Sequence, residues 1–380
     1  IEILEKRKIL FNLWTKLMSL KINKFNNRMM SLAISLAEQR IGLTGENPSV
    51  GCVIVKNNKI ISHAVTNVNG RPHAETIAIN KNKKKINGST VYLTLEPCTH
   101  YGITPPCTNA LIKSKVKKVI YSADDRDQRT YKKAKKILKF NNIITKSGLL
   151  EKETKNLYKS YNYIRKNKFP YIIGKIACSS NLHILNSKAH ITNEHSRKVA
   201  HLLRFKNQGI LTTYKTINSD NPKLTCRIQG LEKFSPVKII IDKYLKIKIN
   251  SNIINNSKKI KTIIFHNSKN FSKIQILKNK NIKLINFKLD KNNNFDLKEI
   301  FKKIYNLGIH TILVEAGKTL TYNIISQKLF NEFYFFKSNK NLNNKDKINV
   351  LDVKKRLDKE FKNKYSVNTY LDKDKLIHYY

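Results

Sequence analysis

The chain has 380 residues, which is long enough for two domains that each bury a core of their own. Lysine and arginine number 74 against 26 aspartate and glutamate residues, so the formal net charge at pH 7 is +48. Because the extra lysine is scattered among Asn and Ile residues, it indicates compositional drift and argues against one basic patch. The five cysteines are too few for a disulfide framework, and no uncharged apolar run is long enough to predict a membrane span.

The first predicted domain is of the alternating α/β type. Residues 1–25 are an N-terminal extension without secretory-signal features, and their role is left open. The run "MMSLAISLAEQR" predicts an amphipathic helix, and "VGCVIVKNNKIISHAV" predicts a hairpin that turns at "KNNK". A helix at "RPHAETIAINK", a strand "STVYLTLE", a helix "TNALIKSK" and a strand "KKVIYSA" complete a domain over residues 26–146.

A polar, mostly helical linker over residues 147–168 separates this domain from a second α/β region over residues 169–336. Strands are predicted at "PYIIGKIACS", "QGILTTY", "VKIIID", "KTIIFH" and "TILVEAG", with a helix at "EHSRKVAHLLRFK". Residues 337–380 are rich in Lys, Asn and Asp and are not assigned to either core.

Candidate zinc ligands lie in the first region, where His73 starts a predicted helix and Cys98 and Cys107 bound a later loop. One imidazole and two thiols suit zinc, and three protein ligands leave one tetrahedral position open, as in catalytic sites. Cys107, at the start of "TNALIKSK", is expected to gain thiolate stability from that helix. Glu75 is expected to move protons rather than bind metal. His-x-Glu, then Pro-Cys and a second Cys, is the signature of zinc deaminases, which release ammonia by hydrolysis.

The spacing of these residues limits the alternatives. A closed structural zinc site would need a fourth ligand, and the candidate, His100, is separated from Cys98 by only one residue. Eight residues separate the two cysteines, whereas enzymes that act on cytidine or on nucleic-acid bases mostly have about two. The long loop therefore argues against nucleic-acid editing.

With these motifs the chain resembles the bifunctional deaminase/reductases of riboflavin biosynthesis. The matching segments are "ENPSVGCVIV", "GRPHAET", "VYLTLEPCTHYGITPPCTNALI" and "FPYIIGKIACS". The resemblance implies a cytidine-deaminase-like three-layer domain followed by a dihydrofolate-reductase-like α/β domain, with zinc and NADPH as cofactors. It also implies deamination of 2,5-diamino-6-(5-phosphoribosylamino)pyrimidin-4(3H)-one, followed by reduction of the ribosyl group to ribityl.

The resemblance also assigns binding residues. Asn47 would bind the pyrimidine. The residues expected to face NADPH are Ala177, His190, Thr216, Asp220 and Gly317. Those expected to face the reductase substrate are Arg204, Leu224, Arg227 and Glu315. Without the resemblance, Asn47 and Asp220 would be interpreted as turn residues. Gly317 would be a helix-start glycine, and Arg204 a solvated helix residue. Leu182 stands where the family has a glycine, and leucine adopts a positive φ only at a cost.

Three hypotheses are kept. The first is the bifunctional enzyme, acting in the cytoplasm on a small molecule and not on nucleic acid, with homo-oligomerisation left open. The second is a pyrimidine deaminase whose reductase domain is degenerate and non-catalytic. The third is a basic nucleic-acid-binding zinc protein, whose affinity for RNA would fall steeply with salt.

Overall fold

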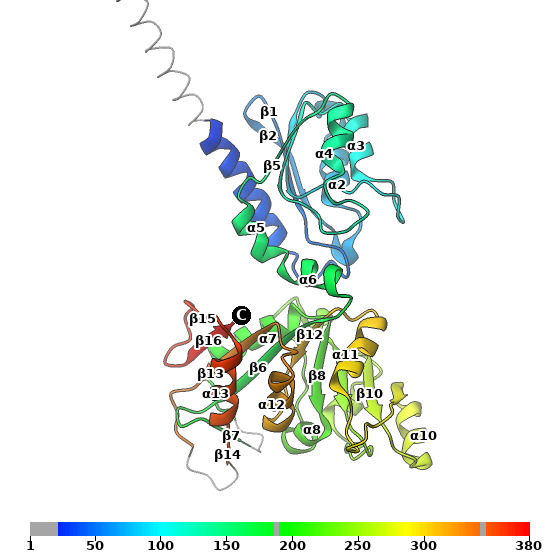
Figure 1. The fold of residues 1–380 in the computed structure, drawn as a ribbon, viewed down its shortest axis with the longest axis vertical. Helices are drawn as coiled ribbons and strands as arrows, with labels where there is room; N and C mark the ends of the chain where they lie inside the picture. The colour runs from blue at the N-terminus through cyan, green and yellow to red at the C-terminus, as the bar shows by residue number, and fades with distance from the viewer. Residues whose placement is uncertain (1–21, 186–189, 343–346) are drawn as a thin grey trace, which may run out of the picture. The chain divides into compact units, whose positions relative to one another are not determined.

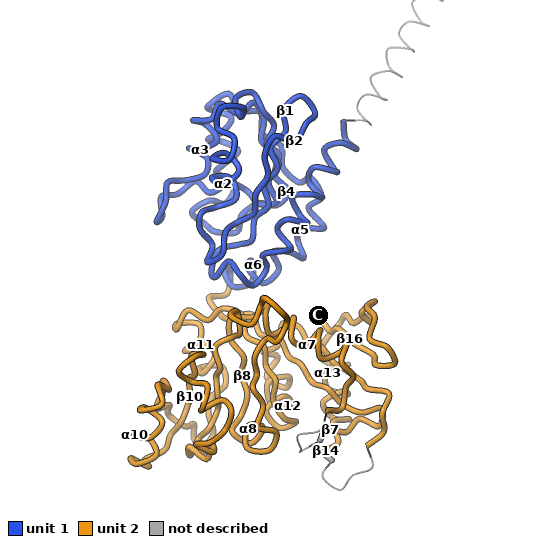
Figure 2. The backbone as a smooth tube through the Cα atoms, turned by 180° about the vertical axis from the view of Figure 1, so that it is seen from behind, with its two compact units in different colours: residues 1–166 blue, residues 167–380 orange. Residues whose placement is uncertain are grey.

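The computed structural model describes residues 22–185, 190–342 and 347–380 (Figure 1). The chain divides into two compact units, residues 1–166 and residues 167–380 (Figure 2). The division falls at the end of the helical segment that the sequence predicts as a linker. Each unit has its own sheet and its own hydrophobic core.

The first unit contains a five-stranded sheet in the order β2-β1-β3-β4-β5. The strands are β1 (Gly51–Lys56), β2 (Lys59–Val65), β3 (Thr90–Leu95), β4 (Lys118–Ala123) and β5 (Ile144–Ser147). β1 is antiparallel to β2 and β3, whereas β3, β4 and β5 are parallel. Asn57 and Asn58 connect β1 to β2 with φ values of 49° and 58°, the left-handed conformation that a tight hairpin turn requires. The predicted hairpin is confirmed.

Helices cover both faces of this sheet (Figure 1). Successive strand residues point to opposite faces, and apolar residues occur on both, so both faces need to be covered. On one face lie α2 (Ala74–Lys81), α3 (Cys107–Lys113) and α4 (Ala134–Phe140), with Ala78, Leu111 and Leu138 in the core. A helix over residues 22–38 covers the other face through Met30, Ala33 and Ile34. The predicted three-layer arrangement is confirmed.

The linker is helical, as predicted, and is attached to the first unit. It contains α5 (Glu151–Leu157) and α6 (Lys159–Asn167), and Tyr158 between them is buried. The Tyr158 hydroxyl donates to the Ser49 carbonyl at 3.1 Å and lies 2.6 Å from Oγ1 of Thr94 on β3. These bonds join the middle of the linker to the first unit.

The second unit contains a nine-stranded sheet in the order β11-β10-β9-β8-β12-β6-β13-β16-β15. Its strands are β6 (Tyr171–Cys178), β8 (Gly209–Thr213), β9 (Val237–Ile241), β10 (Thr262–His266), β11 (Ile282–Asn286), β12 (Thr311–Val314), β13 (Glu332–Lys337), β15 (Lys364–Ser366) and β16 (Lys375–Tyr379). Pairing is parallel from β11 to β13 and antiparallel in β13-β16-β15. A separate antiparallel pair joins β7 (His183–Leu185) and β14 (Lys347–Asn349).

Helices also cover both faces of the second sheet. One face packs against α11 (Leu297–Asn306), α12 (Lys318–Ser326) and α13 (Leu351–Glu360). The other packs against α7 (Glu194–Phe205), α8 (Tyr214–Asp220), α9 (Asn252–Asn255) and α10 (Phe271–Asn279). Short 3-10 helices occur at Val68–Gly70, Lys83–Lys85 and Glu232–Phe234. The expected α/β class is confirmed in both units.

Residues 337–380, which the sequence left unassigned, belong to the second unit. β16 pairs with β13, and its Leu376 and Tyr379 are buried against the core. The two strands of this segment that join the large sheet are short, with three and five residues, and neither alternates apolar and polar residues, so periodicity alone did not reveal them. The nine-stranded sheet is incomplete without this segment.

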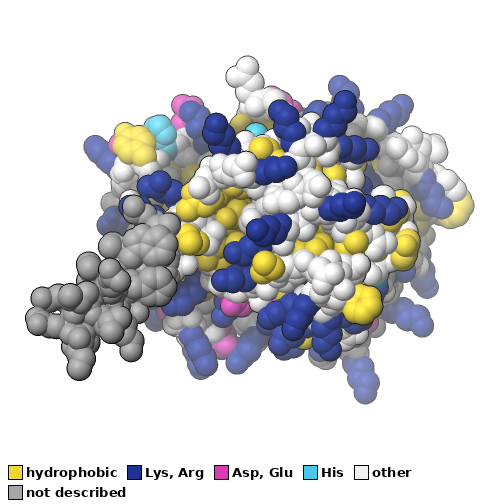
Figure 3. Space-filling view, turned by 90° about the horizontal axis from the view of Figure 1, so that it is seen from above, with side chains coloured by type: hydrophobic (Ala, Val, Ile, Leu, Met, Phe, Trp, Pro, Cys, Tyr) yellow, Lys and Arg dark blue, Asp and Glu magenta, His cyan; other side chains and the backbone are white. Residues whose placement is uncertain are grey.

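Positive charge is spread over the face in Figure 3, where Lys and Arg side chains lie between uncharged and apolar ones. This agrees with the scattered lysine in the sequence. Among the helices of the described ranges, none combines the length and the apolar character needed to traverse a bilayer.

A buried lysine in the second sheet leads to a prediction about stability. Lys238 on β9 is 1% exposed, and its Nζ has no hydrogen-bond partner among the described residues. Burial lowers the pKa of this ammonium group from 10.5 to about 8. The unfolded chain therefore binds the proton more tightly, so the free energy of unfolding should rise as the pH increases from about 8 to 10.5.

Substituting Lys238→Met should remove this penalty, because methionine has a similar length and no charge. We expect the free energy of unfolding at pH 7 to rise by about 1–3 kcal/mol. The increase of stability in the alkaline range should also disappear. Calorimetry at neutral and alkaline pH checks both points, and a variant less stable than the wild type at neutral pH would contradict the prediction.

Candidate functional site

Three side chains with nitrogen or sulfur donors come together in the first unit. His73 is the N-cap of α2, Cys98 lies in the loop after β3, and Cys107 is the first residue of α3. Their donor atoms all lie within 4.8 Å of one another. Nδ1 of His73 is 3.3 Å from Sγ of Cys107 and 3.7 Å from Sγ of Cys98. The ligand atoms of a tetrahedral zinc ion are roughly 3.5 Å apart, so the group fits zinc.

The two sulfurs of this group differ in acidity. The Cys107 thiol donates to the sulfur of Cys98, and the Cys107 backbone N–H donates to it at 3.2 Å. These bonds, together with His73, lower the pKa of Cys98 to about 4. The pKa of Cys107 is raised, because its proton is shared with Cys98 and because the thiol is buried. The backbone N–H at the start of α3 therefore contributes to the stability of a thiolate at Cys98, and the expected stabilisation of a thiolate at Cys107 stays a prediction.

Glu75 lies beside the three donors without belonging to their group. It is in the first turn of α2 and is 3% exposed. Burial raises the pKa of its carboxyl, an effect that His73 opposes and that the charge of Cys98 reinforces. A raised pKa makes a carboxyl a better proton acceptor and donor for catalysis than an ordinary carboxylate.

Two further predicted residues flank the group. Nδ1 of His100 is 3.1 Å from Oγ1 of Thr130, and among the described residues His100 is not part of the donor group. This arrangement disfavours the closed structural zinc site. Nδ2 of Asn47 donates to the carbonyl of Gly70 at 3.4 Å. Gly70 has a φ of +84°, and a Cβ there would lie 2.4 Å from that Nδ2. Only glycine therefore allows the amide of Asn47 to approach the segment that leads to His73.

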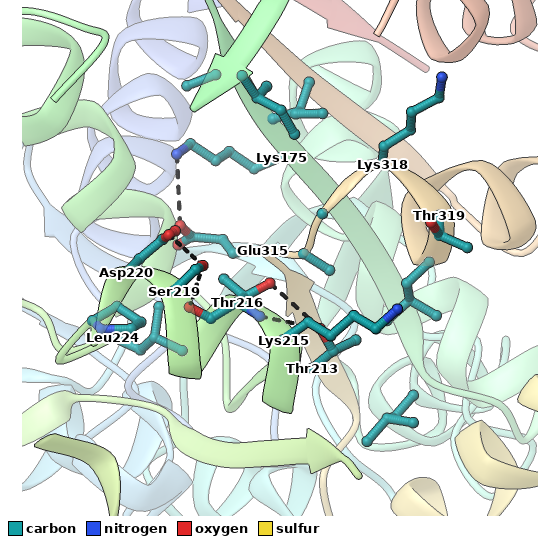
Figure 4. Close-up of a pocket in the computed structure, with 18 of the residues that line it drawn as sticks. Lys175, Thr213, Lys215, Thr216, Ser219, Asp220, Leu224, Glu315, Lys318 and Thr319 are labelled. Carbon is teal, nitrogen blue, oxygen red and sulfur yellow. Dashed lines mark hydrogen bonds and ion pairs between the residues drawn. The ribbon is translucent and has the colours of Figure 1, made fainter. Parts of the chain in front are cut away.

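A second candidate site is a cavity of about 1480 Å³ in the second unit (Figure 4). It lies where β6, β8 and β12 end, which is the usual position of ligand sites in parallel sheets. Every residue predicted for the reductase site lines it: Ala177, His190, Arg204, Thr216, Asp220, Leu224, Arg227, Glu315 and Gly317. Tertiary structure thus brings together residues that are up to 140 positions apart, from 177 to 317.

A buried ion cluster forms one wall of this cavity. Glu315 accepts hydrogen bonds from Nε and Nη2 of Arg204 at 2.7 and 3.0 Å, and Nζ of Lys175 is 3.6 Å away (Figure 4). Burial alone would raise the pKa of Glu315, but Arg204 and Lys175 outweigh it and lower the pKa to about 2. Sequence reasoning did not select Lys175. The available signal was a single lysine inside the apolar strand "YIIGKIAC".

Another part of the cavity wall, at Gly317, leaves room for a ligand to approach the backbone closely. Gly317 precedes α12 with a φ of −68°, and no heavy atom lies within 4 Å of the position a Cβ would take. On α8, Oγ of Ser219 donates to Asp220 at 2.5 Å, and burial raises the pKa of that carboxyl (Figure 4). Leu182, which stands where the family has a glycine, adopts the left-handed conformation at φ +59°, a conformation that leucine adopts only at a cost.

Comparisons with known proteins associate this geometry with a family. A family model of the cytidine and deoxycytidylate deaminase zinc-binding region matches residues 23–123, and one of the RibD C-terminal domain matches residues 182–340. The riboflavin biosynthesis protein RibD of Aquifex aeolicus is 33% identical over 324 residues, covering 83% of this chain and 87% of the relative. The chain belongs to the RibD family. RibD of Buchnera aphidicola is 31% identical over 331 residues.

Solved RibD structures have the same fold. RibD of Acinetobacter baumannii matches with a TM-score of 0.80 at 24% identity, covering 94% of this chain and 99% of that chain. The predicted order of a deaminase-type domain followed by a reductase domain is confirmed. This RibD-family chain is therefore a bifunctional deaminase and reductase of riboflavin biosynthesis. Its deaminase domain is of the zinc-binding type, and its reductase domain uses NADPH.

Proposed function

We propose that the first unit deaminates 2,5-diamino-6-(5-phosphoribosylamino)pyrimidin-4(3H)-one with zinc held by His73, Cys98 and Cys107. The observation that carries this proposal is the convergence of one nitrogen and two sulfur donors beside a buried carboxyl. When bound, zinc supplies a Lewis acid that makes a water molecule more acidic. A carboxylate oxygen of Glu75 takes a proton from the attacking water and delivers it to a ring nitrogen. It then takes the remaining proton from the hydroxyl group that the attack placed on the carbon and delivers it to the departing amine, so that the C–N bond breaks and a carbonyl and ammonia form. Asn47 would orient the pyrimidine.

We further propose that the second unit reduces the ribosyl group of the deaminated product. NADPH supplies the hydride and would contact Ala177, His190, Thr216, Asp220 and Gly317. The substrate would contact Arg204, Leu224, Arg227 and Glu315. Their shared cavity supports this assignment.

The two arginines of this cavity are not equivalent. Nε and Nη2 of Arg204 are engaged by Glu315, whereas Arg227 is exposed and lines the cavity. We therefore infer that Arg227 provides the main contact to the substrate phosphate, through two parallel hydrogen bonds from its guanidinium.

We also propose the extent and setting of these activities. The deaminase domain would span residues 26–146, the linker residues 147–168, and the reductase domain residues 169–336 extended by residues 337–380. The pairing of β16 with β13 supports that extension. A cytoplasmic location, a small-molecule substrate and no nucleic-acid partner are proposed from the scattered charge and the free cysteines. Size-exclusion chromatography of the full chain would test whether it forms homo-oligomers.

One experiment tests both activities. The zinc-loaded protein is incubated with the phosphoribosyl diaminopyrimidinone, with and without NADPH, and the product masses are measured. A gain of about one mass unit reports deamination. A further gain of about two units, seen only with NADPH, reports addition of a hydride and a proton. Deamination without the second gain, together with no NADPH binding, would favour a degenerate reductase unit.

Cys98→Ala should lower zinc content, because it removes one of the three donor atoms of the proposed site. We expect zinc affinity to fall at least 10-fold to 100-fold, with loss of deamination. Elemental analysis after dialysis measures bound zinc. The matched control is Cys226→Ala in the second unit, which should leave zinc content unchanged. Normal zinc occupancy in Cys98→Ala would show that Cys98 is not a ligand.

A further inference from the structure

The hydrogen bonds of His201 define its protonation state. His201 lies on α7, is 8% exposed and lines the cavity of the second unit. Its Nδ1 is 3.0 Å from the carbonyl oxygen of Thr225, which can only accept, and 3.4 Å from Nη1 of Arg204, which can only donate. The shorter contact, and the acceptor role of Nε2 toward Arg227, place the ring proton on Nδ1. Its Nε2 accepts from Nε of Arg227 at 3.2 Å, so Nε2 carries none. The ring is therefore neutral. Burial, together with the charges of Arg204 and Arg227, lowers its pKa to about 4, which agrees with this state.

The bond from Arg227 to His201 uses only the inner nitrogen of the guanidinium. Within the ranges that the structure describes, neither Nη group of Arg227 has a hydrogen-bond partner, although the residue lines the cavity. Both Nη groups are thus free to donate to a ligand. A long exposed side chain normally loses rotamer entropy when it binds, and a bond that already holds Nε reduces that loss.

Arg204 provides a contrast in the same wall. Its Nε and Nη2 donate to Glu315, and its Nη1 donates to the Thr225 carbonyl at 3.2 Å. Arg204 is therefore held by a carboxylate that neutralises its charge. Arg227 is held by a neutral imidazole, which orients the guanidinium without cancelling its charge. Only the second arrangement leaves a full positive charge available to a phosphate.

We propose that His201 is a positioning residue of the reductase, which holds Arg227 by Nε and presents its two Nη groups to the phosphate monoester of the substrate. The proposal rests on the proposed function, because the phosphate belongs to the proposed substrate. His201 makes no contact with the reacting carbon in this account. Its effect should therefore appear in the binding of phosphorylated substrate and not in hydride transfer.

The test uses the full chain and steady-state reduction of 5-amino-6-(5-phosphoribosylamino)uracil and of its dephosphorylated form. In His201→Leu, KM for the phosphorylated substrate should rise roughly 10-fold to 100-fold while kcat changes much less. KM for the dephosphorylated form and the Kd of NADPH should not change. His201→Gln should recover most of the loss, because its amide oxygen can accept from Arg227 near the position of Nε2.

A double-mutant cycle separates positioning from general stabilisation of α7. In an Arg227→Ala background, His201→Leu should add no further increase in KM, because the group that it orients is absent. Independent effects of the two substitutions, or an equal rise in KM for both substrates, would overturn the proposal. Loss of NADPH binding in both His201→Leu and His201→Gln would also overturn it, as the sign of a purely structural role. Failure of the wild type to reduce the phosphorylated substrate would instead contradict the proposed function itself.

Discussion

Replacing Glu75 with glutamine should remove most of the deamination while the protein keeps its zinc. The amide cannot accept a proton from water or return it to the substrate, whereas His73, Cys98 and Cys107 stay in place. We expect ammonia release to slow by about 100-fold to 10,000-fold, the usual contribution of a general acid or base. Coupled detection of ammonia measures the rate, and elemental analysis measures the metal.

The matched control for this substitution is Glu153→Gln on α5, an exposed glutamate of the same unit. It should deaminate at the wild-type rate. Reduction of the deaminated substrate should also be unaffected in Glu75→Gln, because the reductase cavity lies in the other unit. Turnover close to the wild-type rate in Glu75→Gln would show that another group moves the proton.

Replacing Glu315 with glutamine should strongly destabilise the second unit. The substitution leaves Arg204 and Lys175 buried without the carboxylate that neutralises them. Breaking a buried ion pair from one side typically costs about 3–5 kcal/mol in the free energy of unfolding. Denaturant unfolding of the full chain, followed by loss of NADPH binding, measures the effect.

The pH dependence of this ion cluster has a definite sign. The pKa of Glu315 falls from 4.5 to about 2 on folding, so its contribution to stability is present above 4.5 and is lost as the pH falls toward 2. Glu315→Gln should lack this acid-dependent loss. As a control, Glu194→Gln removes a partner of Lys198 whose side chain is 67% exposed, and it should change stability little. A Glu315→Gln protein as stable as the wild type would contradict the assigned role of the cluster.

Much of the fold could be predicted from hydrophobic periodicity and turn residues. The hairpin at Asn57 and Asn58, the helix that begins after His73, and the strand at residues 171–178 all occur as predicted. Such elements are determined by neighbours in the sequence, so local pattern is enough. The strands of residues 364–379 were not predicted, because β16 is stabilised by pairing with β13, and β15 by pairing with β16, and not by their own composition.

The candidate sites also contain some residues that the sequence identifies and others that only the structure identifies. His73, Glu75, Cys98 and Cys107 could be selected because their chemistry and spacing are distinctive. Lys175 and His201 could not be selected, because a lysine in a strand and a histidine in a helix have no distinctive spacing. Their roles depend on partners at Glu315 and Arg227, which are far away in the sequence.

By itself, the sequence determined which side chains could bind zinc, move a proton or contact a phosphate, and it indicated the class of each domain. Only the tertiary structure decided that the Cys107 backbone N–H donates to Cys98, that Arg204 donates to Glu315, and that a neutral His201 holds Arg227. Residue type sets what a group can donate or accept. Its charge state and its available atoms depend on burial and on distances of a few ångströms, which are established when distant segments pack together.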